Sequence, residues 1–198
     1  MITQIRKNVF ETNSSSSHVL VIDTNIKERP DFKLTKNIKI TIPEVDYEGN
    51  YGNGDILDDF ESKLKYLICY AGSKLRWVKA AVYVAKNIAK GQGINLILPK
   101  EVENGTYLWD EWEEDGFVIN HQSSDNFDWI FESLDWGCEE INMKHEACQI
   151  IKTILTDNRI QFWLCWDSDE RAWKIYDPFY RFKSVDNRSM EYLILKEK

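Results

Sequence analysis

Two consecutive stretches with helical periodicity, residues 55–71 and 74–89, constrain the fold more than any other part of the chain. In the first, apolar residues recur at positions 56, 57, 60, 64, 67, 68 and 71, the spacing of one face of a helix. The second has an apolar face of its own, and a glycine (Gly72 or Gly91) follows each stretch as the expected stop. Both helices must bury these faces against other elements.

Short apolar runs typical of strands surround the two helices. We expect strands at 18–23, 38–42, 95–98, 116–120 and 192–195, a hairpin of 160–166 with 171–176, and further helices at 125–134 and 143–155. Helices occur in runs between strands, without strict βαβ alternation. The prediction is therefore an α+β fold, a single domain over residues 1–198, with a mixed or antiparallel sheet packed against two or more amphipathic helices.

Charge is distributed unevenly along the chain. Residues 101–140 hold 13 acids and no Lys or Arg, although the whole chain has a net charge of only −8. Aromatic residues are interleaved with these acids. Acids flanking large aromatics can dock on a basic groove of a partner, with the carboxylates imitating phosphates. The alternative is that the aromatics are core and the acids face water. The candidate partner-binding residues are Trp109, Glu111, Trp112, Glu113 and Glu114.

Basic residues gather instead on the two central helices. Lys63 and Lys65 in the first helix, and a larger set in the second, are expected away from the apolar stripes. A surface that binds a nucleic-acid backbone has this pattern, and so does an ordinary solvated helix face. The candidate nucleic-acid-binding residues are Lys74, Arg76, Lys79, Lys86 and Lys90.

The four cysteines are widely spaced and form no CxxC pair, so reduced and mostly buried thiols are expected. Cys138, His145 and Cys148, with Cys165 or His121, lack a recognised zinc spacing, and no metal site is predicted from them. The acidic turn at 167–170, with Asp177, could hold Mg²⁺ or simply form a turn. No stretch has the length of a membrane span or the pattern of a signal peptide, so a cytoplasmic location is expected.

The densest chemistry lies near the N-terminus, in the hydroxyl-rich run 12–18 that precedes an apolar strand. His18 could act as general acid or base beside Glu11, a serine as nucleophile or phosphate ligand, and Arg6 as the group that stabilises negative charge. The alternative is a Ser/Thr turn that caps the strand with its own hydroxyls. The candidate catalytic residues are Arg6, Glu11, Ser14, Ser15, Ser16 and His18.

The run from Ile5 to His18, with its Val-Phe-Glu-Thr-Asn-Ser-Ser-Ser core, resembles an N-terminal signature of small proteins encoded by phages and mobile elements. Those proteins often have glycine where this chain has Asn8, which puts the geometry of the turn in question. The motif covers about the first 22 residues. More broadly, the chain resembles type II-A anti-CRISPR proteins, some of which trim the guide RNA of the effector complex. This resemblance implies a ribonucleolytic site at the candidate catalytic residues.

This resemblance implies a phage or mobile-element inhibitor of host CRISPR-Cas defence that acts on the effector nuclease or its guide RNA, with cleavage of that RNA by a ribonuclease activity as one mode of action. Two other interpretations stay open. One is a non-catalytic acidic inhibitor that imitates phosphate, and the other is a phosphate- or nucleotide-binding module.

Overall fold

The computed structural model describes residues 16–27, 31–40, 56–72, 74–104, 127–135, 140–166 and 181–195, and every structural statement below concerns these residues. In chain order, its elements are β1 (Ser16–Asp23), β2 (Ile38–Lys39), β3 (Ile56–Leu57), α1 (Phe60–Ala71), α2 (Leu75–Gly91), β4 (Leu96–Ile97), α3 (Lys100–Asn104), the 3-10 turn η1 (Asp128–Ile130), α4 (Glu132–Asp135), α5 (Glu146–Thr156), β5 (Ile160–Trp166), β6 (Phe182–Ser184) and α7 (Asn187–Leu195).

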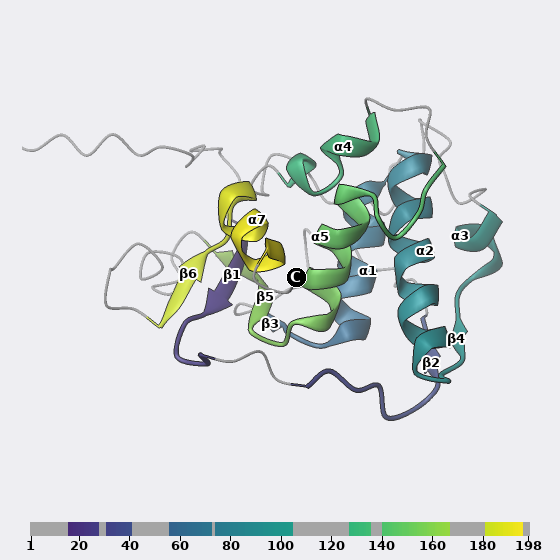
Figure 1. The fold of residues 1–198 in the computed structure, drawn as a ribbon, viewed down its shortest axis with the longest axis horizontal. Helices are drawn as coiled ribbons and strands as arrows, with labels where there is room; N and C mark the ends of the chain where they lie inside the picture. The colour runs from purple at the N-terminus through teal and green to yellow at the C-terminus, as the bar shows by residue number, and fades with distance from the viewer. Residues whose placement is uncertain are drawn as a thin grey trace, which may run out of the picture.

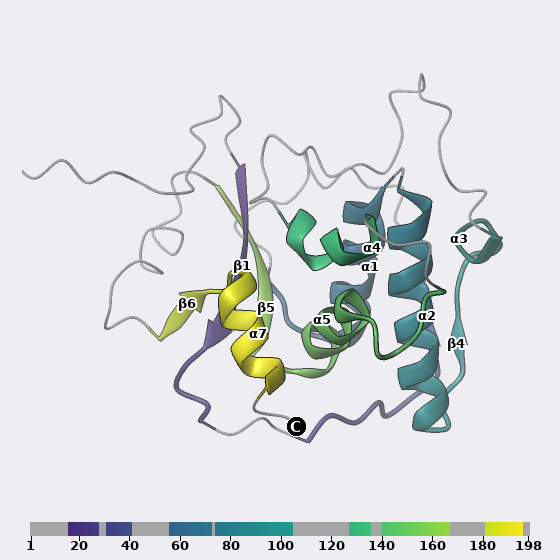
Figure 2. The ribbon, with the colours of Figure 1, turned by 45° about the horizontal axis from the view of Figure 1, so that its top comes forward.

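A four-stranded antiparallel sheet in the order β3-β5-β1-β6 forms one side of the molecule. The longest pairing joins β1 to β5, from Ser16 opposite Trp166 to Ile22 opposite Ile160. A small parallel sheet of β2 and β4 lies at the far end of α2. In Figures 1 and 2 the large sheet and the helices α1, α2 and α5 lie side by side, with α7 beside β1. The predicted α+β class is confirmed.

Both faces of the large sheet bury apolar side chains, because alternate residues of a strand point to opposite faces. Leu20, Phe162 and Leu164 belong to the main core, which they share with α1, α2 and α5. On the other face, Val19, Val21 and Trp163 form a second cluster with Phe182. Burial on both faces explains why the strand region reads as an unbroken apolar run instead of an alternating one.

The helices begin and end at residues with recognisable capping chemistry. The carboxylate of Asp59 accepts hydrogen bonds from the backbone N–H groups of Glu61 and Ser62, so α1 begins at Phe60. Ile56 and Leu57, which share the helical periodicity, instead form β3. Gly72 ends α1 as predicted, with a φ of 46° that an L side chain rarely adopts.

Several other boundaries differ from the sequence prediction. The expected strand at 192–195 is wrong, because this stretch lies in helix α7. Asp186 accepts hydrogen bonds from the N–H and hydroxyl of Ser189, which is the capping pattern of a helix start. The helix expected at 125–134 is a 3-10 turn followed by the short α4, and that at 143–155 begins later, at Glu146. The strands expected at 116–120 and 171–176 lie outside the described residues.

Two cysteines fit the expectation of reduced, buried thiols. Cys69 and Cys148 are buried and free, and desolvation raises the pKa of their thiols to about 12 and about 11. At neutral pH both are protonated and unreactive. None of the described helices is long and apolar enough to cross a membrane.

An ion pair fastens the end of β1 to the start of β6. Asp23 is only 2% exposed, and its carboxylate accepts two hydrogen bonds of 2.8 Å from Nε of Arg181 and a further one from Nη2. The hydrogen bond from Arg181 is the main cause that holds the pKa of Asp23 below its usual value. The pair therefore stabilises the fold above the ordinary pKa of an aspartate, and the contribution is lost as the pH falls further.

We expect Arg181→Gln to lower the free energy of unfolding by about 1–3 kcal/mol, because a nearly buried carboxylate loses its bidentate partner. Urea denaturation at pH 7 measures this difference. Lys152→Gln is the control, since Lys152 is exposed on α5. An equal effect of the two substitutions would contradict the assignment.

Candidate functional site

His18 is the one candidate catalytic residue whose side chain the described part of the chain includes, and it is buried. Its side chain is 2% exposed, and it lies on β1 opposite Leu164 of β5. The Nδ1 atom is 3.1 Å from the hydroxyl of Tyr66 on α1, in a hydrogen bond whose donor depends on the imidazole tautomer. The two rings meet edge to face with centroids 5.8 Å apart.

The surroundings of His18 keep its imidazole neutral. Tyr66 is itself fully buried. The centroid of its ring lies 4.3 Å from that of Phe162 and 6.2 Å from that of Phe127. Desolvation in this apolar environment lowers the pKa of His18 to about 4. A general acid at neutral pH needs a protonated imidazole and access to the substrate. His18 has neither in the described structure, and its geometry is that of a core residue satisfied by Tyr66.

The remaining candidate catalytic residues cannot be placed around it. Arg6, Glu11, Ser14 and Ser15 lie outside the described residues. Ser16 begins β1, and its backbone pairs opposite Trp166, so the strand includes the end of the serine run. Their proposed roles stay predictions.

The basic candidates on α2 form a single exposed strip. With 100° between successive residues, Arg76, Lys79, Lys86 and Lys90 fall within an arc of about 80°. The three lysines are exposed and Arg76 is partly exposed, whereas the opposite side of the helix is buried against α1 and α5. The helix contains no Asp or Glu. We call these four residues the α2 basic strip; it extends about 21 Å along the helix axis.

Among the described residues, one ion pair joins this strip to a neighbouring acid. Nζ of Lys86 lies 2.7 Å from Oε1 of Glu103 on α3, in a pair whose side chains are both well exposed. Such exposed pairs contribute little to stability and exchange readily with other anions. Neither Lys79 nor Lys90 forms an ion pair with another described residue.

Lys74 does not belong to this strip. It precedes α2 at a position at least about 120° around the axis from the other four. Its Nζ lies 3.4 Å from the centroid of the Trp77 ring and 3.7 Å from Oδ2 of Asp128. A cation over an aromatic face, next to a carboxylate, holds the start of α2 against η1.

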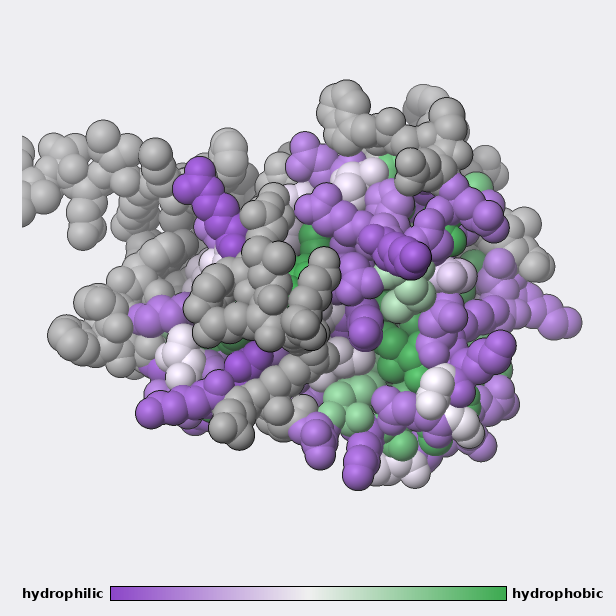
Figure 3. Space-filling model, viewed as in Figure 1, coloured by the Kyte–Doolittle hydropathy of each residue, from purple (hydrophilic) through white to green (hydrophobic). Residues whose placement is uncertain are grey.

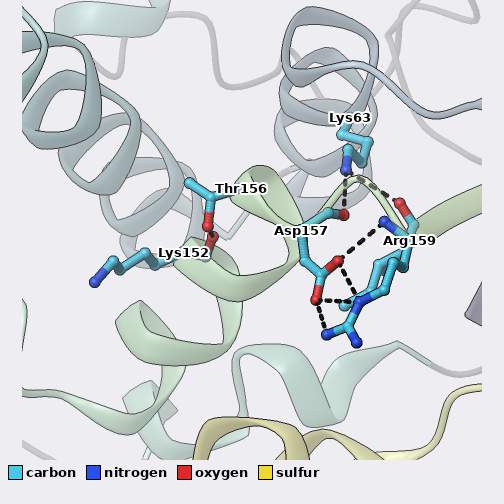
Figure 4. Close-up of polar contacts among 6 residues, drawn as sticks. Lys63, Lys152, Thr156, Asp157 and Arg159 are labelled. Carbon is cyan, nitrogen blue, oxygen red and sulfur yellow. Dashed lines mark hydrogen bonds and ion pairs between the residues drawn. The ribbon is translucent and has the colours of Figure 1, made fainter. Parts of the chain in front are cut away.

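Lys63, predicted on a solvated basic face, is instead fully buried, so that part of the prediction is wrong. Its Nζ donates hydrogen bonds to the backbone carbonyls of Asp157 (3.1 Å) and Ile160 (3.0 Å), where α5 ends and β5 begins (Figure 4). Carbonyls at a helix end carry partial negative charge, which favours a cation there.

Asp157 supplies the negative charge of this junction. Its side chain is fully buried and is held by Arg159, whose Nε lies 2.9 Å from Oδ1 and whose Nη2 lies 2.6 Å from Oδ2 (Figure 4). Hydrogen bonding to Asp157 raises the pKa of Arg159. We call Lys63, Asp157 and Arg159 the junction cluster. The hydrogen bonds among these residues and the burial of Lys63 and Asp157 indicate a structural role.

The described parts of the acidic segment contribute to the core. Phe127, Ile130 and Phe131 are buried, and the ring of Phe131 stacks on that of Trp77 with centroids 4.8 Å apart. Here the aromatics are core residues, as the alternative interpretation holds. The candidate partner-binding residues 109–114 lie outside the described residues, as do the acids at 167–170 and Asp177. The residues that are described include no group of three or more potential metal ligands.

Sequence reasoning missed two features of these regions. Tyr83 lies in the middle of the α2 basic strip, half-buried, at the i+4 position from Lys79. The sequence could have predicted this position, because residues three and four apart share a helix face. The junction cluster was not readable, because Lys63 meets residues more than 90 positions away.

No protein-family model, curated protein or solved structure matches this chain.

Proposed function

We propose that this protein is a phage or mobile-element inhibitor of host CRISPR-Cas defence that binds the effector ribonucleoprotein in the bacterial cytoplasm, with the α2 basic strip on the guide RNA. The observation that carries the proposal is the strip itself: four cations within one narrow arc of a rigid helix that contains no acid. The N-terminal resemblance supports the link to mobile elements.

Binding, not cleavage, is the activity that the geometry supports. Lysine and arginine side chains neutralise phosphates without requiring a particular base sequence. The buried, neutral His18 offers no support for acid-base chemistry at its position. The strip lies on a helix whose opposite face is buried, so the helix backbone is already ordered before binding.

The test uses a double charge reversal, Lys79→Glu with Lys90→Glu, in the full chain. We expect guide RNA and the loaded effector to bind the variant at least about tenfold more weakly than the wild type at 0.1 M salt, because two phosphate contacts become repulsive. Fluorescence anisotropy measures the affinity, and a DNA-cleavage assay of the effector measures inhibition, which should fall in parallel.

Lys144→Glu with Lys152→Glu is the matched control. It makes the same change in net charge at two exposed residues outside α2. Equal weakening by both pairs would show a nonspecific charge effect and contradict the proposal. The guide RNA should remain full length on a denaturing gel after incubation with the wild type. Shortened RNA that is absent with His18→Ala would instead support the ribonuclease predicted from the sequence.

A further inference from the structure

The position of Tyr83 within the α2 basic strip defines the kind of nucleic acid that the strip fits. Tyr83 lies four residues after Lys79 and three before Lys86, so both lysines flank it on the same helix face. Trp77 and Tyr83 are the aromatic residues of α2, and Trp77 is fully buried. Tyr83 is therefore the aromatic group that this helix presents among its exposed cations.

The ring of Tyr83 is also held in place. Its side chain is partly buried and packs against the main core. An aromatic ring that is fixed before binding loses little freedom when a partner stacks on it.

We propose that the α2 basic strip binds single-stranded nucleic acid, with one unpaired base stacked on Tyr83 and the flanking phosphates on Arg76, Lys79, Lys86 and Lys90. This inference rests on the proposed function and specifies its ligand. Aromatic platforms set among cations bind single strands, since every base has a π face available once it is unpaired. In a duplex the bases are stacked on each other, and the deep major groove of an RNA helix does not admit side chains.

In the proposed site the strip contacts phosphates and the face of one base, and neither contact selects a base sequence or the sugar. Its cations contact phosphates, and Asn87, the amide beside Tyr83, donates one of its N–H groups to the helix backbone. Single-stranded RNA and DNA of one sequence should therefore bind with similar affinity, and a duplex of that sequence more weakly.

The experiment measures the binding of a fluorescein-labelled oligonucleotide of about 12 nucleotides, a length within the range of single-strand sites. Tyr83→Leu keeps an apolar side chain against the core but removes the stacking surface. We expect it to weaken binding of the single strand about tenfold, whereas Tyr83→Phe should bind as the wild type does. Thermal melting of both variants checks that the fold is unchanged.

The salt dependence separates stacking from charge. For the wild type, the plot of log affinity against log salt concentration should have a slope of about −3, because four phosphate contacts contribute about −0.7 each on a single strand. Tyr83→Leu should keep this slope and lower the affinity at every salt concentration. Lys79→Glu with Lys90→Glu should reduce the size of the slope to about 1.4 or less, because at most two of the four phosphate contacts remain.

Three results would overturn the inference: equal affinity for duplex and single strand, a strong preference for RNA over DNA, or wild-type binding by Tyr83→Leu. If Tyr83→Leu binds normally but the lysine pair does not, the proposed function stands and the stacking site fails. If neither change affects binding, both proposals fail.

Discussion

Replacing Asp157 with alanine is expected to lower the free energy of unfolding by about 3–5 kcal/mol, the range found when one partner of a buried ion pair is removed. Asp157 has no exposed surface, and its carboxylate accepts hydrogen bonds from the guanidinium and the backbone N–H of Arg159. Without the carboxylate, Arg159 loses this ion pair, and its backbone N–H loses its acceptor, at the junction of α5 and β5. Urea denaturation followed by circular dichroism measures the loss.

Asn158→Ala is the control for this prediction. Asn158 belongs to the same turn, but its side chain is exposed. We expect a change of less than about 0.5 kcal/mol for it, as for most surface substitutions. If Asp157→Ala has an effect that small, the junction cluster is not the stabilising unit that its geometry indicates.

The second prediction concerns the stability of the fold at acid pH. Because the pKa of His18 is about 4 in the folded state and 6.5 is the ordinary value, the unfolded chain binds this proton more tightly. The folded state therefore loses stability as the pH falls below 6.5, and the loss is complete below about 4. The shift predicts a cost of about 2 kcal/mol at pH 5 and about 3 kcal/mol at pH 4.

His18→Gln isolates this contribution, since glutamine fills a similar volume and does not titrate. The free energies of unfolding of the wild type and the variant should converge by about 2 kcal/mol between pH 7.5 and pH 5. All other titrating groups cancel in the difference. Parallel stability curves over this range would show that His18 is not buried as a neutral imidazole.

Local sequence patterns predicted the elements that depend on local chemistry. The apolar face of α2, the Gly72 stop of α1 and the apolar strands β1 and β5 all follow from periodicity and backbone preference. Helix α7 was mistaken for a strand because four consecutive apolar or aromatic residues fit either structure. Asp186 and Ser189 carried the decisive capping signal.

The burial of Lys63 and of His18 depends on tertiary contacts, which local patterns do not predict. The periodicity of α1 allows an exposed position for Lys63, but this helix is covered on nearly every side, and the partners of Lys63 come from the distant α5–β5 junction. Likewise, His18 after the serine run was a candidate general acid or base, with an ordinary strand residue as the alternative. Its burial against Tyr66 depends on how β1 packs on α1, which residue types alone do not encode.

The strand order also sets a sequence of events during synthesis. In the large sheet, β1 lies between β5 and β6, and its partners are 138 or more positions later in the chain. Strand β1 must therefore wait until β5, at residues 160–166, has emerged from the ribosome before it can pair. The consecutive helices α1 and α2 contact each other locally and can associate much earlier, since short-range contacts form fastest. Pairing of the strand that follows the hydroxyl-rich run thus depends on chain synthesised more than 130 residues later.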